Sequence, residues 1–148
     1  MGQGVTGICM HNQCSLYMAL FPVTANPLDD PFYYLNNFMQ VLDWLEHRYA
    51  DVLSDEEHRF IRDFNGLPRE SRALLVRMVM RKGVHFRASK LYYAEIGDIP
   101  SAAQPLLALG WLDDRQPLPV EALFEVLLKA EILQCLGNAI VKPKGKKT

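Results

Sequence analysis

An apolar stripe at helical spacing runs along the chain directly after Asp29-Asp30-Pro31. An acidic residue before a proline at the first helical position is a start signal for a helix. The apolar residues that follow recur three or four positions apart, so they share one face of that helix: Leu35, Phe38, Met39, Leu42, Leu45 and Tyr49. Because hydrophobic residues make up 49% of the 148 residues, the chain can build a packed core around such a stripe.

Two further helices are predicted at short intervals. Ser54 and Glu57 have the spacing of a capping box, which opens a helix that Asn65-Gly66 ends. The third helix is predicted to start at Leu67-Pro68-Arg69-Glu70 and to stop at Lys82-Gly83. The residues predicted to face the core are Phe60, Ile61 and Phe64 in the second helix, and Leu74, Leu75, Met78 and Val79 in the third.

Strand-forming residues at close intervals between Val84 and Tyr93 predict a short strand or hairpin. A fourth helix is predicted from Ile99-Pro100-Ser101 to Gly110, and Trp111-Leu112 is predicted to return as the partner strand of Val84–Phe86. The fold class is therefore mainly α with a small β hairpin. This order is compatible with a winged-helix-like unit over residues 29–116, although a four-helix cluster with a small hairpin also fits.

The two ends of the chain have a different character. Residues 1–28 hold no charged side chain other than histidine and no sustained period, which predicts a poorly ordered leader. The spacing Cys9-x-His11-x-x-Cys14 lacks an evident fourth ligand for zinc, so a structural or incidental role is preferred. Beyond Pro117 and Pro119, helices are predicted over Val120–Leu128 and Glu131–Leu136, followed by a lysine-rich tail.

Charge is distributed unevenly, although the formal net charge is only −1. No Lys or Arg precedes Arg48, whereas the segment from Arg69 to Lys90 holds seven basic residues against one acid, Glu70. A nearly neutral chain of this kind can still present a basic surface to phosphate. Three widely placed cysteines suit a reducing compartment, and no stretch is long enough to span a bilayer. We therefore expect an intracellular protein, cytoplasmic and nucleoid-associated, or nuclear in a eukaryote.

Several stretches resemble the Fanconi-associated nuclease family of structure-selective DNA repair nucleases. Residues 31–42, PFYYLNNFMQVL, and the acidic turn 53–57, LSDEE, resemble the start of that family. The most specific match is residues 76–98, VRMVMRKGVHFRASKLYYAEIGD, followed by LGWL at 109–112. Residues 121–136, EALFEVLLKAEILQCL, are similar to the entry into the family's SAP module, a small helix–loop–helix DNA binder.

This resemblance implies that different parts of a longer protein carry out different functions. Residues 29–116 would be a DNA-binding region, and residues 117–148 would begin a truncated SAP-like module. In the family these parts bind branched or flapped DNA. A helical-repeat linker and a VRR-NUC domain follow them in the sequence. The latter gives the family its phosphodiesterase I-type hydrolase activity, with Mg or Mn, in interstrand cross-link repair. No lysine of this chain has Asp or Glu two positions before it, so we expect no catalytic residue, cofactor or metal here.

The candidate DNA-binding residues each have a structural alternative. Arg77, Arg81 and Lys82 suit phosphate contact, but they also suit a helix C-terminus, and Arg77 or Arg81 could pair with Glu95. Tyr34 and Tyr93 match positions near DNA in the family, yet ordinary core packing is the alternative for both. The remaining candidates, each with a solvated surface or tail as the alternative, are Arg87, Lys90, Lys144, Lys146 and Lys147.

Two other classes of function stay open at this point. A free-standing winged-helix regulator would need polar side chains on its recognition helix for the edges of bases, and the third helix is largely apolar between its arginines. A protein-interaction module would use that Met-rich helix as its docking face. It would be favoured if the basic residues proved buried or internally paired.

Overall fold

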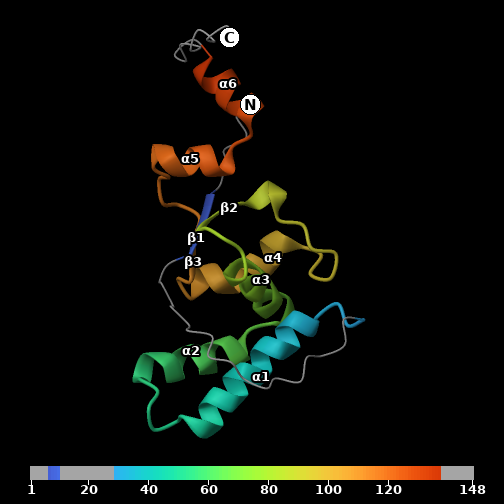
Figure 1. The fold of residues 1–148 in the computed structure, drawn as a ribbon, viewed down its shortest axis with the longest axis vertical. Helices are drawn as coiled ribbons and strands as arrows, with labels where there is room; N and C mark the ends of the chain where they lie inside the picture. The colour runs from blue at the N-terminus through green and yellow to red at the C-terminus, as the bar shows by residue number, and fades with distance from the viewer. Residues whose placement is uncertain (1–6, 11–28, 138–148) are drawn as a thin grey trace, which may run out of the picture.

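The computed structural model describes residues 7–10 and 29–137 of the chain. The described elements confirm a mainly helical fold with few strand residues (Figure 1). The helices are α1 (Tyr33–Arg48), α2 (Asp55–Gly66), α3 (Arg69–Val79), α4 (Ile99–Ala108), α5 (Val120–Val126) and α6 (Lys129–Leu136), with one 3-10 turn, η1 (Ala88–Lys90). The strands are β1 (Gly7–Met10), β2 (His85–Arg87) and β3 (Leu112–Asp113).

Helix α2 starts at its predicted signal, whereas α1 starts at Tyr33, two residues after the predicted first helical position, Pro31. The Asp30 carboxylate accepts a hydrogen bond from the Phe32 backbone N–H at 2.9 Å and one from the Asn36 amide at 2.6 Å, so it anchors the entry to α1. The predicted capping box is confirmed at α2. There the Glu57 backbone N–H donates to the Ser54 hydroxyl, and the Glu57 carboxylate accepts from the Ser54 backbone N–H.

Helix α3 ends earlier than the sequence predicts. It stops at Val79 rather than at Lys82-Gly83, and the Arg81 N–H closes the end by donating to the carbonyl of Met78 at 3.1 Å. Gly83 then adopts a φ of 90°, a left-handed conformation that redirects the chain toward β2. Val79, predicted to face the core, is the last residue of α3 and is 48% exposed. Helices α5 and α6 also differ by two residues from their predicted ranges.

The sheet differs from the predicted hairpin. Its strand order is β2-β1-β3, with β1 antiparallel to both neighbours. Leu112 and Asp113 therefore pair with β1 and not with the segment that begins at Val84, so the predicted direct pairing is wrong. The central strand comes from residues 7–10, inside the segment predicted to be a poorly ordered leader. The rest of that leader lies outside the described residues.

The core lies between α1, α2, α3 and α4 and extends to the sheet. Phe64, Leu74, Met78 and Leu106 are completely buried at its centre. Phe64 also packs against Phe38 and Phe60, with ring centroids 5.3 Å and 5.9 Å apart. Aromatic contacts of this kind stabilise a core beyond the area that they bury. The predicted inward faces of the second and third helices are therefore confirmed apart from Val79.

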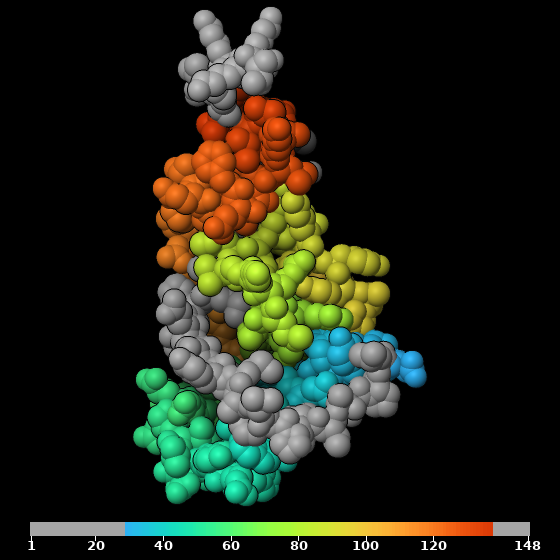
Figure 2. Space-filling view, viewed as in Figure 1, coloured from blue at the N-terminus to red at the C-terminus, as the bar shows by residue number. Residues whose placement is uncertain are grey.

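Helices α5 and α6 lie at the opposite end of the long axis from α1 and α2, where they form the orange and red part of Figure 2. Helix α5 contacts β2, and its Ala122 and Val126 are buried, although neither belongs to the core cluster of the main helical unit. Within the described ranges, no helix is both long enough and apolar enough to cross a membrane.

Candidate nucleic-acid interface

The turn between α3 and β2 carries two exposed candidate cations. Every residue from Val79 to Val84 is exposed, and Arg81 and Lys82 lie in the middle of this turn. Among the described residues, neither of the two forms an ion pair with a carboxylate. The guanidinium of Arg81 lies 6.0 Å from the centre of the Tyr93 ring, at the outer limit of a cation–π contact. Both side chains are thus free to meet phosphate.

Arg77, one turn earlier on α3, is used differently. Its Nη2 and Nε lie 2.6 Å and 3.0 Å from Oε1 of Glu95, and its guanidinium lies over the Tyr34 ring at 3.9 Å. Burial alone would lower the pKa of Arg77, but hydrogen bonds to Glu95 and Tyr34 outweigh it and raise the pKa. The predicted alternative of an internal pair with Glu95 is confirmed for Arg77, which is therefore part of the fold.

The two candidate tyrosines also belong to the folded unit. Tyr34 is 3% exposed, and its hydroxyl donates to Oε1 of Glu95 at 3.1 Å. Burial is the main reason that the pKa of Tyr34 rises to about 12. Tyr93 is partly buried against the core, with the Arg77 guanidinium 5.3 Å from its ring centre. Neither ring is presented as an open stacking platform, which favours the core-packing interpretation for both residues.

Arg87 and Lys90 lie where the helical unit meets α6. Arg87 Nη1 lies 2.6 Å from Oε2 of Glu131, so it forms an ion pair that the sequence did not predict. The hydrogen bond from Arg87 is the main reason that the pKa of Glu131 falls to about 2, and the Leu128 backbone N–H contributes as well. Lys90 is exposed, and its positive charge adds to this lowering.

The predicted site therefore separates into three groups. Arg81, Lys82 and Lys90 are exposed, whereas Arg77, Arg87, Tyr34 and Tyr93 are engaged within the fold. The tail residues Lys144, Lys146 and Lys147 lie outside the described residues. Sequence reasoning missed Glu131 as the partner of Arg87. The only local signal was its place three residues after Leu128 at a helix start, which predicts a cap and not an ion pair.

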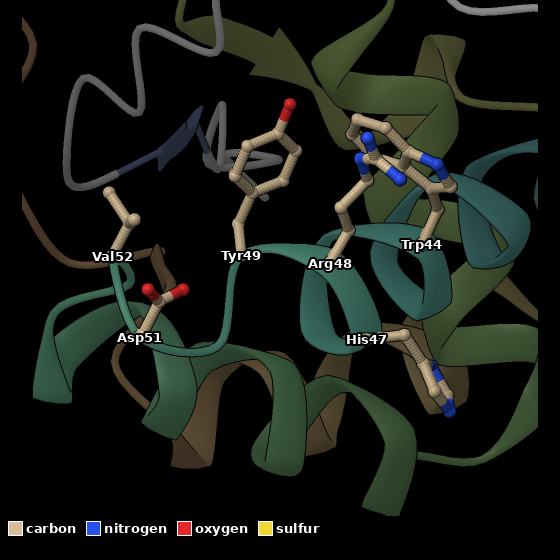
Figure 3. Close-up of a pocket in the computed structure, with 6 residues that line it drawn as sticks. All are labelled: Trp44, His47, Arg48, Tyr49, Asp51 and Val52. Atoms are coloured by element: carbon tan, nitrogen blue, oxygen red, sulfur yellow. The ribbon is translucent and has the colours of Figure 1, made fainter.

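A separate surface hollow lies at the end of α1, in a part of the sequence well before Arg81 and Lys82 (Figure 3). Trp44 and Tyr49 meet edge to face there, with ring centroids 5.0 Å apart, and Arg48 and Asp51 add charges of both signs. The hollow holds no nucleophile with a neighbouring base. In the part of the chain that the structure describes, no group of three or more His, Cys, Asp or Glu could hold a metal ion.

Comparison with known proteins gives a consistent result. The family model described as "FAN1, HTH domain" matches residues 32–113. The Fanconi-associated nuclease 1 homolog of Pseudomonas aeruginosa is 55% identical over 138 residues, which cover 93% of this chain and 24% of that protein. The homolog of Oryza sativa is 35% identical over 80 residues, covering 54% of this chain and 8% of that protein. The chain thus spans about a quarter or less of these relatives.

Two solved structures are similar over most of the chain. The crystal structure of paFAN1 bound to 2nt 5′flap DNA with gap has a TM-score of 0.76 and 51% identity, covering 82% of this chain and 22% of that one. The complex of paFAN1 with 1nt 5′flap DNA with gap has a TM-score of 0.72 and 52% identity, with coverage of 79% and 22%.

Proposed function

We propose, from the premise that this chain belongs to the family of the FAN1 HTH domain, that it is the DNA-binding portion of a structure-selective nuclease. Its partner would be duplex DNA with a 5′ flap or another branch, because the similar solved structures are those of a protein bound to 5′flap DNA. In this proposal α5 and α6 begin a SAP-like module beside the helical unit, and the protein acts inside the cell in DNA repair.

The observation that carries this proposal is the state of Arg81 and Lys82. Two adjacent cations in an exposed turn, with no carboxylate paired to them in the described residues, retain their full charge for an anionic partner. Phosphate oxygens suit them, since contacts of guanidinium and ammonium groups to the backbone fix a protein on DNA without selecting its sequence. Lys90 adds a third exposed cation after β2.

Hydrolysis is assigned to another part of a longer protein. The chain contains no lysine with an acid two positions before it, and the described residues offer no acidic cluster for Mg or Mn. Metal-dependent phosphodiester cleavage needs such a cluster to activate water and to neutralise the developing charge. In this proposal, this portion holds and orients the duplex for a catalytic domain elsewhere, and the chain spans 24% of the Pseudomonas aeruginosa relative.

The two alternative functions are less well supported. The protein-interaction interpretation would be favoured by buried or internally paired basic residues. Arg77 and Arg87 are paired in this way, but Arg81, Lys82 and Lys90 are not. A sequence-specific regulator would read base edges with polar residues of α3. That helix instead buries Leu74, Leu75 and Met78 among its arginines.

Fluorescence anisotropy with the 148-residue chain tests the proposal. Labelled 5′-flap duplexes of unrelated sequence should bind with similar affinity, because phosphate contacts carry no sequence information. The logarithm of the binding constant should fall against the logarithm of salt concentration with a slope of about −2 to −3, at about −0.9 per phosphate contact. Binding to flap DNA without salt dependence, or no binding at low salt, would refute the proposal.

A further inference from the structure

The exposed turn after α3 displays apolar side chains as well as cations. Met80 is 67% exposed and Val84 is 47% exposed, on either side of Arg81 and Lys82. We call residues 80–84 the apolar–basic turn. Figure 2 shows the yellow-green atoms of this part of the chain on the visible face of the molecule, below the α5 and α6 helices. Single exposed apolar residues are common on protein surfaces, but two that flank a pair of cations form a combined surface.

The turn is held firmly at both of its ends. Met78, two residues before it, is completely buried, and Phe86, two residues after it, is 5% exposed in β2. β2 in turn is paired with β1 at Phe86 and Ile8. The core therefore fixes where the turn emerges, and Met80 and Val84 are held outward instead of packing inside. A rigid scaffold of this kind lowers the entropy that a turn loses when it binds a partner.

The charge of the turn indicates what it contacts. The turn contains no acidic residue, and Glu95, close by on the loop before α4, is held by Arg77 and Tyr34. An uncompensated positive charge beside apolar side chains suits a polyanion with accessible apolar faces. Fully stacked duplex DNA hides the faces of its bases, whereas a nick, gap or flap leaves a base step open. Minor-groove binding proteins insert Met and other apolar side chains between base steps, so such side chains can pack against the faces of bases.

We infer that Met80 and Val84 contact the faces of bases left unstacked at a break in duplex DNA, while Arg81 and Lys82 hold the flanking phosphates. The inference rests on the proposed function, and it assigns the selection of interrupted over continuous duplex to these two apolar residues. The cations supply affinity for any duplex, because phosphates are present on both kinds of DNA. Apolar contact adds affinity only where a base face is available.

Neutral substitutions separate these two contributions. Met80→Gln with Val84→Thr keeps the charge and nearly the shape of the turn but makes it polar. Two DNAs of equal length and sequence are compared by anisotropy, one continuous and one with a 5′ flap and a one-nucleotide gap. We expect the variant to lose about tenfold in affinity for the gapped flap, equivalent to about 1.4 kcal/mol, and to bind the continuous duplex as the unmodified chain does.

A fluorescent base reports the contact itself. 2-Aminopurine at the gap should change its emission when the unmodified chain binds, and this change should be lost with Met80→Gln/Val84→Thr. Met80→Leu with Val84→Ile keeps the turn apolar and should retain both the affinity and the signal. Val52→Thr, at a residue that is 74% exposed in the loop after α1, is the matched control and should change neither.

Different failures have different meanings. Equal affinity loss on both DNAs, or no loss on either, would overturn the role of Met80 and Val84 and leave DNA binding intact. If the unmodified chain binds neither DNA, the proposed function and this inference are both refuted. Both residues are exposed, so the thermal midpoint of the variant should stay within a few degrees of the unmodified chain.

Discussion

One carboxylate oxygen of Glu95 accepts three hydrogen bonds, two of them from Arg77, with Nη2 at 2.6 Å and Nε at 3.0 Å. The third comes from the hydroxyl of Tyr34. This contact joins α1, α3 and the loop before α4, and the side chain of Glu95 is only 11% exposed. Burial alone would raise the pKa of Glu95, but the backbone and side-chain hydrogen bonds outweigh it and lower the pKa. The pair is therefore a structural clamp.

Replacing either partner of this clamp should destabilise the fold. We expect Arg77→Met and Glu95→Gln each to lower the free energy of unfolding by about 1–3 kcal/mol, as for hydrogen bonds to charged groups. In a double-mutant cycle by urea denaturation, the coupling energy should reach about 0.5–3 kcal/mol. Additive effects would contradict the clamp. DNA affinity per folded molecule should be unchanged in Arg77→Met, because its guanidinium is already occupied.

Tyr34→Phe separates packing from DNA stacking at that position. The substitution removes the hydroxyl that donates to Glu95 and keeps the buried ring. We expect the free energy of unfolding to fall by about 1 kcal/mol, the usual net value of one hydrogen bond, with no change in DNA affinity. A fall in affinity at constant stability would instead place Tyr34 in the interface.

The attachment of α6 should depend on pH through Glu131. Its pKa is lowered from the ordinary value of 4.5 to about 2, so the contact with Arg87 is fully present above about 4.5 and is lost as pH falls through 2. In a carboxyl NMR titration, Glu131 should titrate near pH 2. With Arg87→Gln its pKa should rise toward 4.5. An ordinary pKa in the unmodified chain would show that the Arg87–Glu131 pair does not form.

The chain alone should not cleave DNA. Highly purified chain incubated with a labelled 5′-flap duplex should yield no product in the presence of Mg or Mn, because the sequence holds no acid–x–Lys arrangement to bind metal and orient water. A heat-denatured sample provides the background. Metal-dependent cutting that co-purifies with the chain through several columns would contradict this expectation.

Local signals in the sequence were enough to predict most helices. The capping box of Ser54 and Glu57 and the apolar spacing of Leu35 and Leu42 are short-range patterns, and the structure shows the expected helix start and buried face. The end of α3 was harder to predict, because Met80 to Lys82 remain compatible with a helix and only the path to β2 decides the boundary.

Long-range pairings could not be predicted from the same signals. The strand β1 lies in a stretch without a sustained hydrophobic periodicity. It pairs with β2, and the helices α1, α2 and α3 lie between the two strands in the sequence. The ion pair of Arg87 with Glu131 joins residues 44 positions apart, and nothing in the spacing of charges selects this partner among the other acids. The sequence therefore predicted a basic segment correctly, but it could not distinguish the engaged cations from the exposed ones.

Replacement of Arg81 and Lys82 by alanine tests the central claim most directly. Anisotropy and thermal unfolding are measured on the same Arg81→Ala/Lys82→Ala protein, with Arg59→Ala/Arg62→Ala as a control that removes the same charge from exposed positions of α2. We predict that this protein binds flap DNAs of unrelated sequence more weakly, with a similar loss of affinity for each. The salt slope should fall by about one unit per lost contact. The free energy of unfolding should change by less than about 1 kcal/mol. The control should retain the slope. A double variant that unfolds several kcal/mol more easily, yet binds DNA unchanged per folded molecule, would contradict the account.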